Sequence, residues 1–214
     1  MGYASMDHAV IKPESDNDGS NGATDLRRAP RFTLLIRSAK LISTQGEFVC
    51  VIRDVSATGI SMKLFHTLPQ GNELTLELQC GETYQIKRVW EREGEAGFEF
   101  VENVDVEQFV SEVGQFPKRG LRLNIRIPAI MTASLKRAAV EIHNISQQGA
   151  LFEADTLLAM DQNLRIESKG LGEFYAKVRW RDDNRYGVVF DDVMTLGDFA
   201  RMAARLQAPS LITG

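Results

Sequence analysis

A polar signature occurs twice in this chain, ninety residues apart, and each copy follows a basic cluster at the same interval. The copies share three positions: Asp54, Ser56 and Gly59 in the first, and Asn144, Ser146 and Gly149 in the second. The same offset relates Trp90 to Trp180 and Phe100 to Phe190. A repeat at one fixed offset indicates that a domain has been duplicated. The chain is therefore expected to fold as two similar units, each with its own core.

The chain divides into a tail and two domains. Residues 1–24 are rich in Asp, Ser, Asn and Gly and hold few large apolar side chains, so we expect a disordered tail there. A first domain is expected over residues 25–113 and a second over residues 117–208, with a short linker between them. Domains of about ninety residues are large enough to bury a modest core without disulfides or metal.

Composition excludes several classes of protein. No apolar run approaches the roughly 20 residues that a membrane-spanning helix needs, and the N-terminus lacks a signal-peptide pattern. We therefore expect a cytoplasmic protein with no membrane span. Cys50 and Cys80 have no counterparts in the second half, which favours two reduced thiols in strands. The three histidines lack metal-ligand spacing, so no metal or other cofactor is expected.

Short segments of alternating apolar and polar residues dominate both halves, and turn residues separate them. Such segments predict half-buried β-strands, here at 48–52, 73–78, 84–90, 140–142, 164–166 and 174–180. Several short strands at close spacing indicate a small antiparallel barrel or sandwich in each half.

Each half then ends in a helical pattern. Apolar residues recur at three- and four-residue steps: Val106, Phe109, Val110 and Val113 in the first half, and Phe199, Met202, Ala203 and Leu206 in the second. A helix packed on its own domain is the simpler interpretation. A dimer interface is the alternative, so a homodimer stays open.

Charge is distributed unevenly along the chain. The net charge of −4 argues against a nucleic-acid polymer as partner, because such proteins favour basic surfaces. Two stretches nevertheless carry basic residues and no acid: Arg27, Arg28, Arg31, Arg37 and Lys40 in one, and Lys118, Arg119, Arg122, Arg126, Lys136 and Arg137 in the other. Matched basic islands in an acidic protein favour a small anionic ligand. A solvated basic strand face is the alternative.

The signature itself has groups suited to such a ligand. In an extended segment Asp54 and Ser56 share one face while Val55 turns into the core. Gly59 supplies a turn or lets a ligand approach the backbone. Guanidinium groups bind phosphate and the O6/N7 edge of guanine, so the basic loop and the signature together fit a phosphorylated guanine compound. The alternative is that Asp54 and Ser56 merely cap a turn. Core packing is the simpler role for Trp90 and Trp180, and base stacking is the other.

The order of these features resembles the PilZ domain family: Arg-x-x-x-Arg, about twenty residues, Asp/Asn-x-Ser-x-x-Gly, then a strand with Trp and a Gly-x-x-Phe ending. The resemblance covers residues 25 to 207 as two copies. It implies two six-stranded antiparallel barrels, each followed by a C-terminal helix, in a mainly β protein. It also implies a bacterial receptor for cyclic di-GMP, with arginines on the phosphates and guanine edges and the signature strand on the other side of the base.

The resemblance carries over to two candidate ligand sites. The first consists of Arg27, Arg28, Arg31, Asp54, Ser56 and Gly59, and the second of Lys118, Arg119, Arg122, Asn144, Ser146 and Gly149. In the second, Lys118 stands where the leading arginine belongs, and lysine lacks the planar fork. Arg119 can substitute by a shift of the loop, whereas pairing Arg122 with Arg126 shortens the separation from Asn144 and is disfavoured. We expect the first domain to be the main site and the second a weaker one.

The sequence does not predict an enzyme. It has no Gly-x-Ser-x-Gly elbow, no phosphate-cradling glycine loop and no carboxylate pair at repeated positions. We expect ligand binding to order the arginine-rich loop and so to signal to an effector protein that the sequence does not name. The alternative is a protein–protein interaction module whose ligand site has degenerated.

Overall fold

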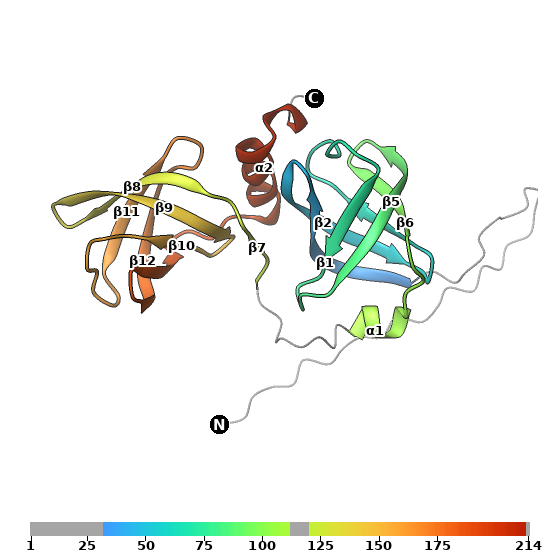
Figure 1. Ribbon diagram of the computed structural model, residues 1–214, viewed down its shortest axis with the longest axis horizontal. Coiled ribbons are helices and arrows are strands. Elements are labelled where there is room, and N and C mark those ends of the chain that lie inside the picture. Colours follow the sequence, from blue (N-terminus) through green and yellow to red (C-terminus); the bar gives the residue numbers. More distant parts are fainter. Residues whose placement is uncertain (1–31, 112–119, 213–214) are drawn as a thin grey trace, which may run out of the picture.

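A computed structural model describes residues 32–111 and 120–212, with side chains from residue 37 onward. Two β-barrels lie side by side, and a helix runs between them (Figure 1). The predicted tail and the predicted linker lie outside the described residues.

The first barrel has six antiparallel strands. They are β1 (Phe32–Ser43), β2 (Gly46–Val55), β3 (Gly59–Lys63), β4 (Glu73–Glu77), β5 (Thr83–Arg92) and β6 (Glu95–Phe100). The strands close in the order β1-β2-β3-β6-β5-β4. Alternate side chains of these strands point inward, and Leu41, Phe48, Ile52, Met62 and Leu76 fill the interior.

The second barrel repeats this plan. Its strands are β7 (Arg122–Leu123), β8 (Ile127–Ala133), β9 (Lys136–Ser146), β10 (Gly149–Glu153), β11 (Asn163–Ser168), β12 (Gly172–Asp182) and β13 (Arg185–Phe190). Strands β8 to β13 form a six-stranded sheet that the pairing of β10 with β9 closes, and β7 adds to the free part of β9. The prediction of two six-stranded antiparallel barrels is confirmed.

The offset of ninety residues holds throughout the two barrels. Strand β3 begins at Gly59 and β10 at Gly149, while β6 ends at Phe100 and β13 at Phe190. Each segment of predicted alternation falls in a strand, except that the segment 73–78 runs one residue past the end of β4. One detail is wrong: Cys50 lies in β2, but Cys80 lies in the turn after β4, and both are buried free thiols.

A short helix follows the first barrel. Helix α1 (Val106–Ser111) buries Phe109, whose ring lies 5.1 Å from that of Tyr84 and 5.9 Å from that of Phe100. The guanidinium of Arg37 donates hydrogen bonds to the carbonyls of Phe109 and Val110, at 2.9 and 2.6 Å. Arg37 lies on β1, so these two bonds hold the helix on the barrel.

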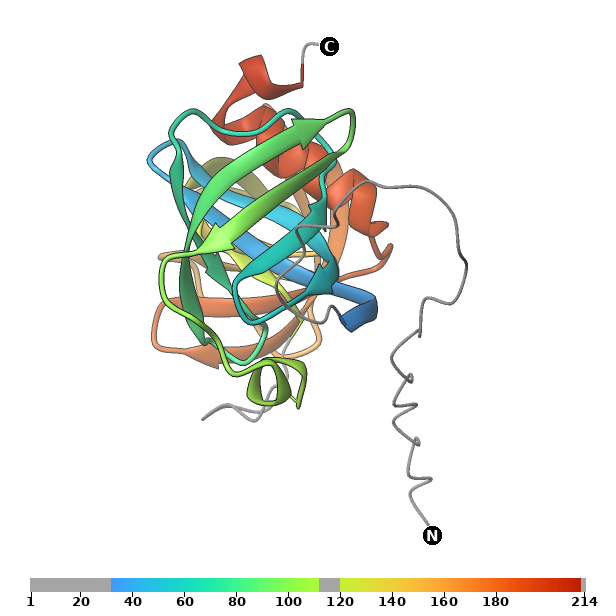
Figure 2. The same cartoon turned by 90° about the vertical axis from the view of Figure 1, so that its right-hand side faces the viewer.

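The helix after the second barrel packs on both barrels. Helix α2 (Leu196–Gln207) begins at a Thr195 cap and continues into a 3-10 turn, η1 (Pro209–Leu211). It runs along the side of the first barrel that faces the second (Figures 1 and 2). Phe199 and Ala203 belong to the core of the second barrel, whereas Ala204, Ala208 and Leu211 belong to the core of the first. The helix therefore packs on its own domain, as predicted, and also on the first barrel, which was not predicted.

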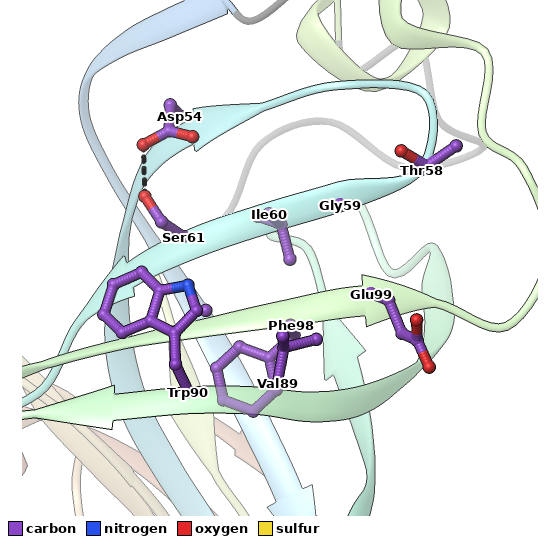
Figure 3. A pocket seen from close by; sticks show the side chains of 10 residues that line it. Asp54, Thr58, Gly59, Ile60, Ser61, Val89, Trp90, Phe98 and Glu99 are labelled. Atoms are coloured by element: carbon purple, nitrogen blue, oxygen red, sulfur yellow. Dashed lines mark hydrogen bonds between the residues drawn. The ribbon is translucent and has the colours of Figure 1, made fainter. Parts of the chain in front are cut away.

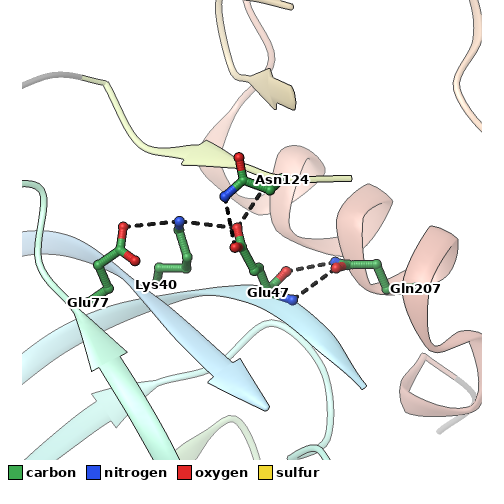
Figure 4. Close-up of polar contacts among 5 residues, drawn as sticks. All are labelled: Lys40, Glu47, Glu77, Asn124 and Gln207. Atoms are coloured by element: carbon green, nitrogen blue, oxygen red, sulfur yellow. Dashed lines mark hydrogen bonds and ion pairs between the residues drawn. The ribbon is translucent and has the colours of Figure 1, made fainter. Parts of the chain in front are cut away.

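A polar network joins the barrels beside α2 (Figure 4). The buried ammonium of Lys40 lies 3.1 Å from the Glu47 carboxylate and 3.0 Å from that of Glu77. Glu47 also accepts hydrogen bonds from the backbone and side-chain nitrogens of Asn124, at 2.8 and 2.9 Å. Its backbone N–H donates to the Gln207 side chain at 2.9 Å, and its carbonyl accepts from the same side chain at 2.7 Å. The β1–β2 turn of the first barrel is thus bonded to the entrance of the second barrel and to α2.

Candidate functional site

A cavity of about 190 Å³ opens on the outer face of the first barrel (Figure 3). Strands β2, β3, β5 and β6 and the β2–β3 turn supply its lining, which consists of Asp54, Thr58, Gly59, Ile60, Ser61, Val89, Trp90, Gly97, Phe98 and Glu99. The cavity therefore lies directly on the first copy of the repeated signature.

Asp54 faces this cavity because the strand pairing is irregular there. Ile52 pairs with Met62 and Asp54 with Ser61, so the β2–β3 register shifts by one residue between them. Such a bulge lets Arg53 and Asp54 both leave the core face, while Ile52 and Val55 stay fully buried. The Ser61 hydroxyl donates a hydrogen bond to the Asp54 carboxylate and fixes its direction (Figure 3).

Ser56 has a different environment from Asp54. It is 6 % exposed, and its hydroxyl donates to the Gly59 carbonyl at 3.2 Å and accepts from the Gly59 N–H at 3.1 Å. Ser146 likewise donates to the Gly149 carbonyl, at 3.1 Å, and is 7 % exposed. In both barrels the serine holds the turn closed, as in the turn-capping alternative, whereas Asp54 and Gly59 are the signature residues that line the cavity.

Both tryptophans lie on the outside of the barrels. Trp90 is 36 % exposed and Trp180 is 42 % exposed, so the prediction that they pack in the core is wrong. Each indole packs closely on a glycine of the neighbouring strand, and a Cβ at Gly97 or Gly187 would overlap the indole nitrogen. In the first barrel the indole forms one wall of the cavity, and the Arg92 guanidinium lies 5.3 Å from its ring centre.

The second barrel brings three of its predicted site residues together. Arg122 and Ser146 are paired across β7 and β9, and the Arg122 guanidinium donates to the Asn144 side-chain oxygen at 3.1 Å. Leu151 stands opposite Asn144, where the first barrel has Ser61 opposite Asp54. Gly149 is needed for strand packing, since a Cβ there would overlap the Val188 carbonyl.

The remaining predicted site residues are Arg27, Arg28, Arg31, Lys118 and Arg119, and they lie outside the described residues. Most of the described basic residues of the two islands have protein partners. Besides Lys40 and Arg37, Arg126 lies 3.5 Å from Glu141, and Arg137 lies 3.4 Å from Glu167. For the basic residues that lie in or beside the strands, a structural role on the barrel surface explains their presence without a ligand.

Three polar residues of the cavity lining were not predicted: Thr58, Ser61 and Glu99. Their ninety-residue counterparts are Gln148, Leu151 and Val189, so the repeat gave no signal for them. Trp90 and Gly97 did belong to the repeat. A glycine that recurs with the tryptophan was the available sign that the indole packs on the outside of the barrel, where the glycine leaves room for it.

The described part of the chain shows neither a metal centre nor a membrane helix. Within it, no three side chains of His, Cys, Asp or Glu gather closely enough to hold an ion. Neither described helix combines the length and the apolar character that crossing a bilayer requires.

Comparison with known proteins identifies the family. The model of the PilZ domain matches residues 25–116 and again residues 112–207. No curated protein sequence matches the chain.

Several solved structures are similar to this chain at low identity. PlzA of Borreliella burgdorferi in complex with c-di-GMP is 10 % identical over 84 % of this chain and 94 % of that one, with a TM-score of 0.35. The Bacillus subtilis inhibitor of motility MotI/DgrA is 13 % identical over 83 % and 98 %, with a TM-score of 0.34. YcgR of Escherichia coli in complex with c-di-GMP is 11 % identical over 79 % and 81 %, with a TM-score of 0.31.

The assignment rests on the two family matches, which cover both barrels. The chain belongs to the PilZ domain family, with two PilZ domains in tandem.

Proposed function

We propose that this protein is a receptor for cyclic di-GMP and that the first barrel carries the main site. The observation that supports this most directly is the Asp54 carboxylate, which Ser61 fixes at the edge of a cavity walled by Trp90. The signature strand lines this cavity, and the complete Arg27–Arg31 motif precedes that strand in the sequence. PilZ domains as a family bind this messenger.

The chemistry of the site matches the ligand. The Asp54 carboxylate can accept hydrogen bonds from N–H or hydroxyl donors of a nucleotide, and arginine forks bind the O6/N7 edge of guanine and the phosphates. The exposed indole of Trp90 offers an apolar wall for a base. Acceptors on one side and arginines on the other would enclose a guanine nucleotide, and its two negatively charged phosphates would contact the arginines.

The second barrel is the weaker site in this proposal. Lys118 replaces the leading arginine, Leu151 stands where Ser61 would orient the acceptor, and Arg122 is already bonded to Asn144. One charge-assisted hydrogen bond is worth about 1.5–3 kcal/mol, or roughly 10- to 150-fold in affinity. Arg122 must also exchange its bond to Asn144 for a bond to ligand. This occupied arginine supports the alternative of an interaction module for the second barrel.

The proposed signal is ordering of the arginine-rich loop. The two phosphates neutralise Arg27, Arg28 and Arg31 and hold the loop against the Asp54 strand, which alters the surface offered to an effector protein. Hydrogen exchange over residues 20–35 should slow when cyclic di-GMP is added. Unchanged exchange at saturating ligand would rule out this signal. The protein acts as a receptor and not as an enzyme in this scheme, so no turnover of the nucleotide is expected.

Titration calorimetry on the whole chain tests the receptor assignment. Separated barrels are unsuitable, because Ala204, Ala208 and Leu211 belong to the core of the first barrel but follow the second in sequence. Arg31→Ala should abolish tight binding without unfolding the protein. Arg181→Ala, which changes an exposed arginine of the β12–β13 hairpin, should leave it unchanged. A folded wild-type protein that binds no cyclic di-GMP would favour the interaction module instead.

A further inference from the structure

We propose that Glu99 is a specificity-determining residue of the first site, where it accepts hydrogen bonds from the amino edge of a guanine. This inference rests on the proposed function and deepens it. Glu99 is not part of the repeated signature, and its counterpart in the second barrel is Val189. The second site therefore has no acceptor at this position.

Glu99 lines the cavity at a point where the floor is open. It stands on β6 directly opposite Gly59 of β3, and glycine has no side chain to cover the space between them. Asp54 and Ser61 lie towards one end of the cavity and Glu99 towards the other (Figure 3). A base lying on the Gly59–Phe98 part of the floor thus meets a carboxylate at its edge.

The Glu99 carboxylate is exposed and available to a ligand. Its other cross-strand neighbour is Lys87 on β5, whose ammonium instead lies 3.5 Å from Glu73. In residues 37–111 and 120–212, no hydrogen bond or ion pair engages the Glu99 side chain. A ligand donor can bind there without displacing a protein partner.

The charge of Glu99 restricts which ligand group it can bind. A carboxylate is an acceptor only, and it repels the phosphates of an anionic ligand. The groups that it binds favourably are therefore N–H donors. Guanine presents two parallel donors, N1–H and the exocyclic amine, which match the two carboxylate oxygens. Hypoxanthine lacks the amine, and adenine carries an acceptor at N1.

Whether replacing Glu99 weakens or tightens ligand binding distinguishes a hydrogen bond to the ligand from simple charge repulsion. Removal of a negative charge near a dianion should tighten binding if Glu99 makes no contact. Loss of a hydrogen bond to a charged acceptor should weaken binding by about 10- to 150-fold. A site built to bind a donor also rejects an analogue that lacks it, so the preference for guanine should fall as well.

The experiment measures the binding of three probes, cyclic di-GMP, cyclic di-IMP and cyclic di-AMP, to the whole chain. The variants are Glu99→Gln and Glu99→Val, which introduces the residue type of the second barrel. Glu102→Gln is the matched control, since Glu102 is exposed and carries the same charge but does not line the cavity. Circular dichroism verifies that each variant is folded.

We expect wild-type protein and Glu102→Gln to prefer cyclic di-GMP over both analogues. Both Glu99 variants should bind cyclic di-GMP at least about 10-fold more weakly and lose most of their preference over cyclic di-IMP. Equal or tighter binding of cyclic di-GMP by Glu99→Gln, with the preference intact, overturns the role of Glu99 and leaves the receptor assignment standing. A wild-type protein that binds none of the probes overturns both.

Discussion

The Glu47 carboxylate of the first barrel accepts hydrogen bonds from both nitrogens of Asn124 in the second, the backbone one at 2.8 Å and the side-chain one at 2.9 Å. Asn124 follows Arg122 by two residues, and Arg122 contacts Asn144 in the second candidate site. The strand that enters the second barrel is therefore fixed to the first barrel on one side and to its own signature on the other. Together with the packing of α2 on both barrels, Glu47 fixes the position of one domain relative to the other.

Replacing Glu47 with Gln should destabilise the protein by about 1–3 kcal/mol, because it weakens the hydrogen bonds to Asn124 and removes one of two anions from the buried Lys40 ammonium. Urea unfolding measures the change. Glu73→Gln is the control, since the Lys87–Glu73 pair is largely exposed and should change stability by less than about 0.5 kcal/mol. Equal effects of the two substitutions would contradict the importance of the network.

Replacing Ser61 with Ala should weaken the binding of cyclic di-GMP by about 10-fold, because the Asp54 carboxylate loses the donor that directs it. Ser61→Thr keeps the hydroxyl and should retain most of the affinity. Calorimetry on both variants makes the comparison. A loss of equal size in the two would mean that space at this position matters and the hydrogen bond does not.

The two tryptophans provide a fluorescence test of which barrel binds. Trp90 lines the cavity of the first barrel, and Trp180 occupies the equivalent place in the second. Ligand that stacks beside Trp90 should change its emission. Trp180→Phe should therefore keep the response to cyclic di-GMP, and Trp90→Phe should lose it. The reverse pattern would move the main site to the second barrel.

Cys50 should make the protein less stable at alkaline pH. Burial raises the pKa of Cys50 to about 12 from an ordinary value of 9.0, and a hydrogen bond with the Ala39 backbone opposes this only in part. Because the folded pKa exceeds the unfolded one, the contribution of the neutral thiol is complete below pH 9.0 and is lost progressively as the pH rises towards 12.

Urea unfolding at about pH 8 and about pH 10 checks this contribution. The stability of the wild type should fall more steeply between these values than that of Cys50→Ala, by up to roughly 1.4 kcal/mol per pH unit. Parallel curves for the two proteins would show that the thiol does not ionise on unfolding.

Much of the fold could be predicted because duplication and alternation are both local signals in the chain. The alternation failed where the strands bulge. The β5–β6 register shifts between Arg88 and Trp90, and the β12–β13 register shifts between Val178 and Trp180. Each shift turns a tryptophan outward, although simple alternation from Ile86 or Val178 places it inward. A bulge depends on the partner strand, so one strand's sequence does not reveal it.

Only part of the candidate site could be predicted, because some of its residues do not recur in the second barrel. Asp54 was identified because the signature repeats, but Ser61 and Glu99 differ between the barrels and gave no such signal. The network around Glu47 joins residues far apart in the chain, and its members look like ordinary surface charges in the sequence. Such contacts depend on how the barrels meet, which no periodicity encodes.

The position of α2 also bears on how the protein is made. The first barrel's own strands end at Phe100, yet its interior is completed by Ala204, Ala208 and Leu211. During translation this part of the first barrel's apolar core therefore stays uncovered until the second barrel and its helix have been made. The first barrel thus reaches its final packing only after the second barrel has been translated.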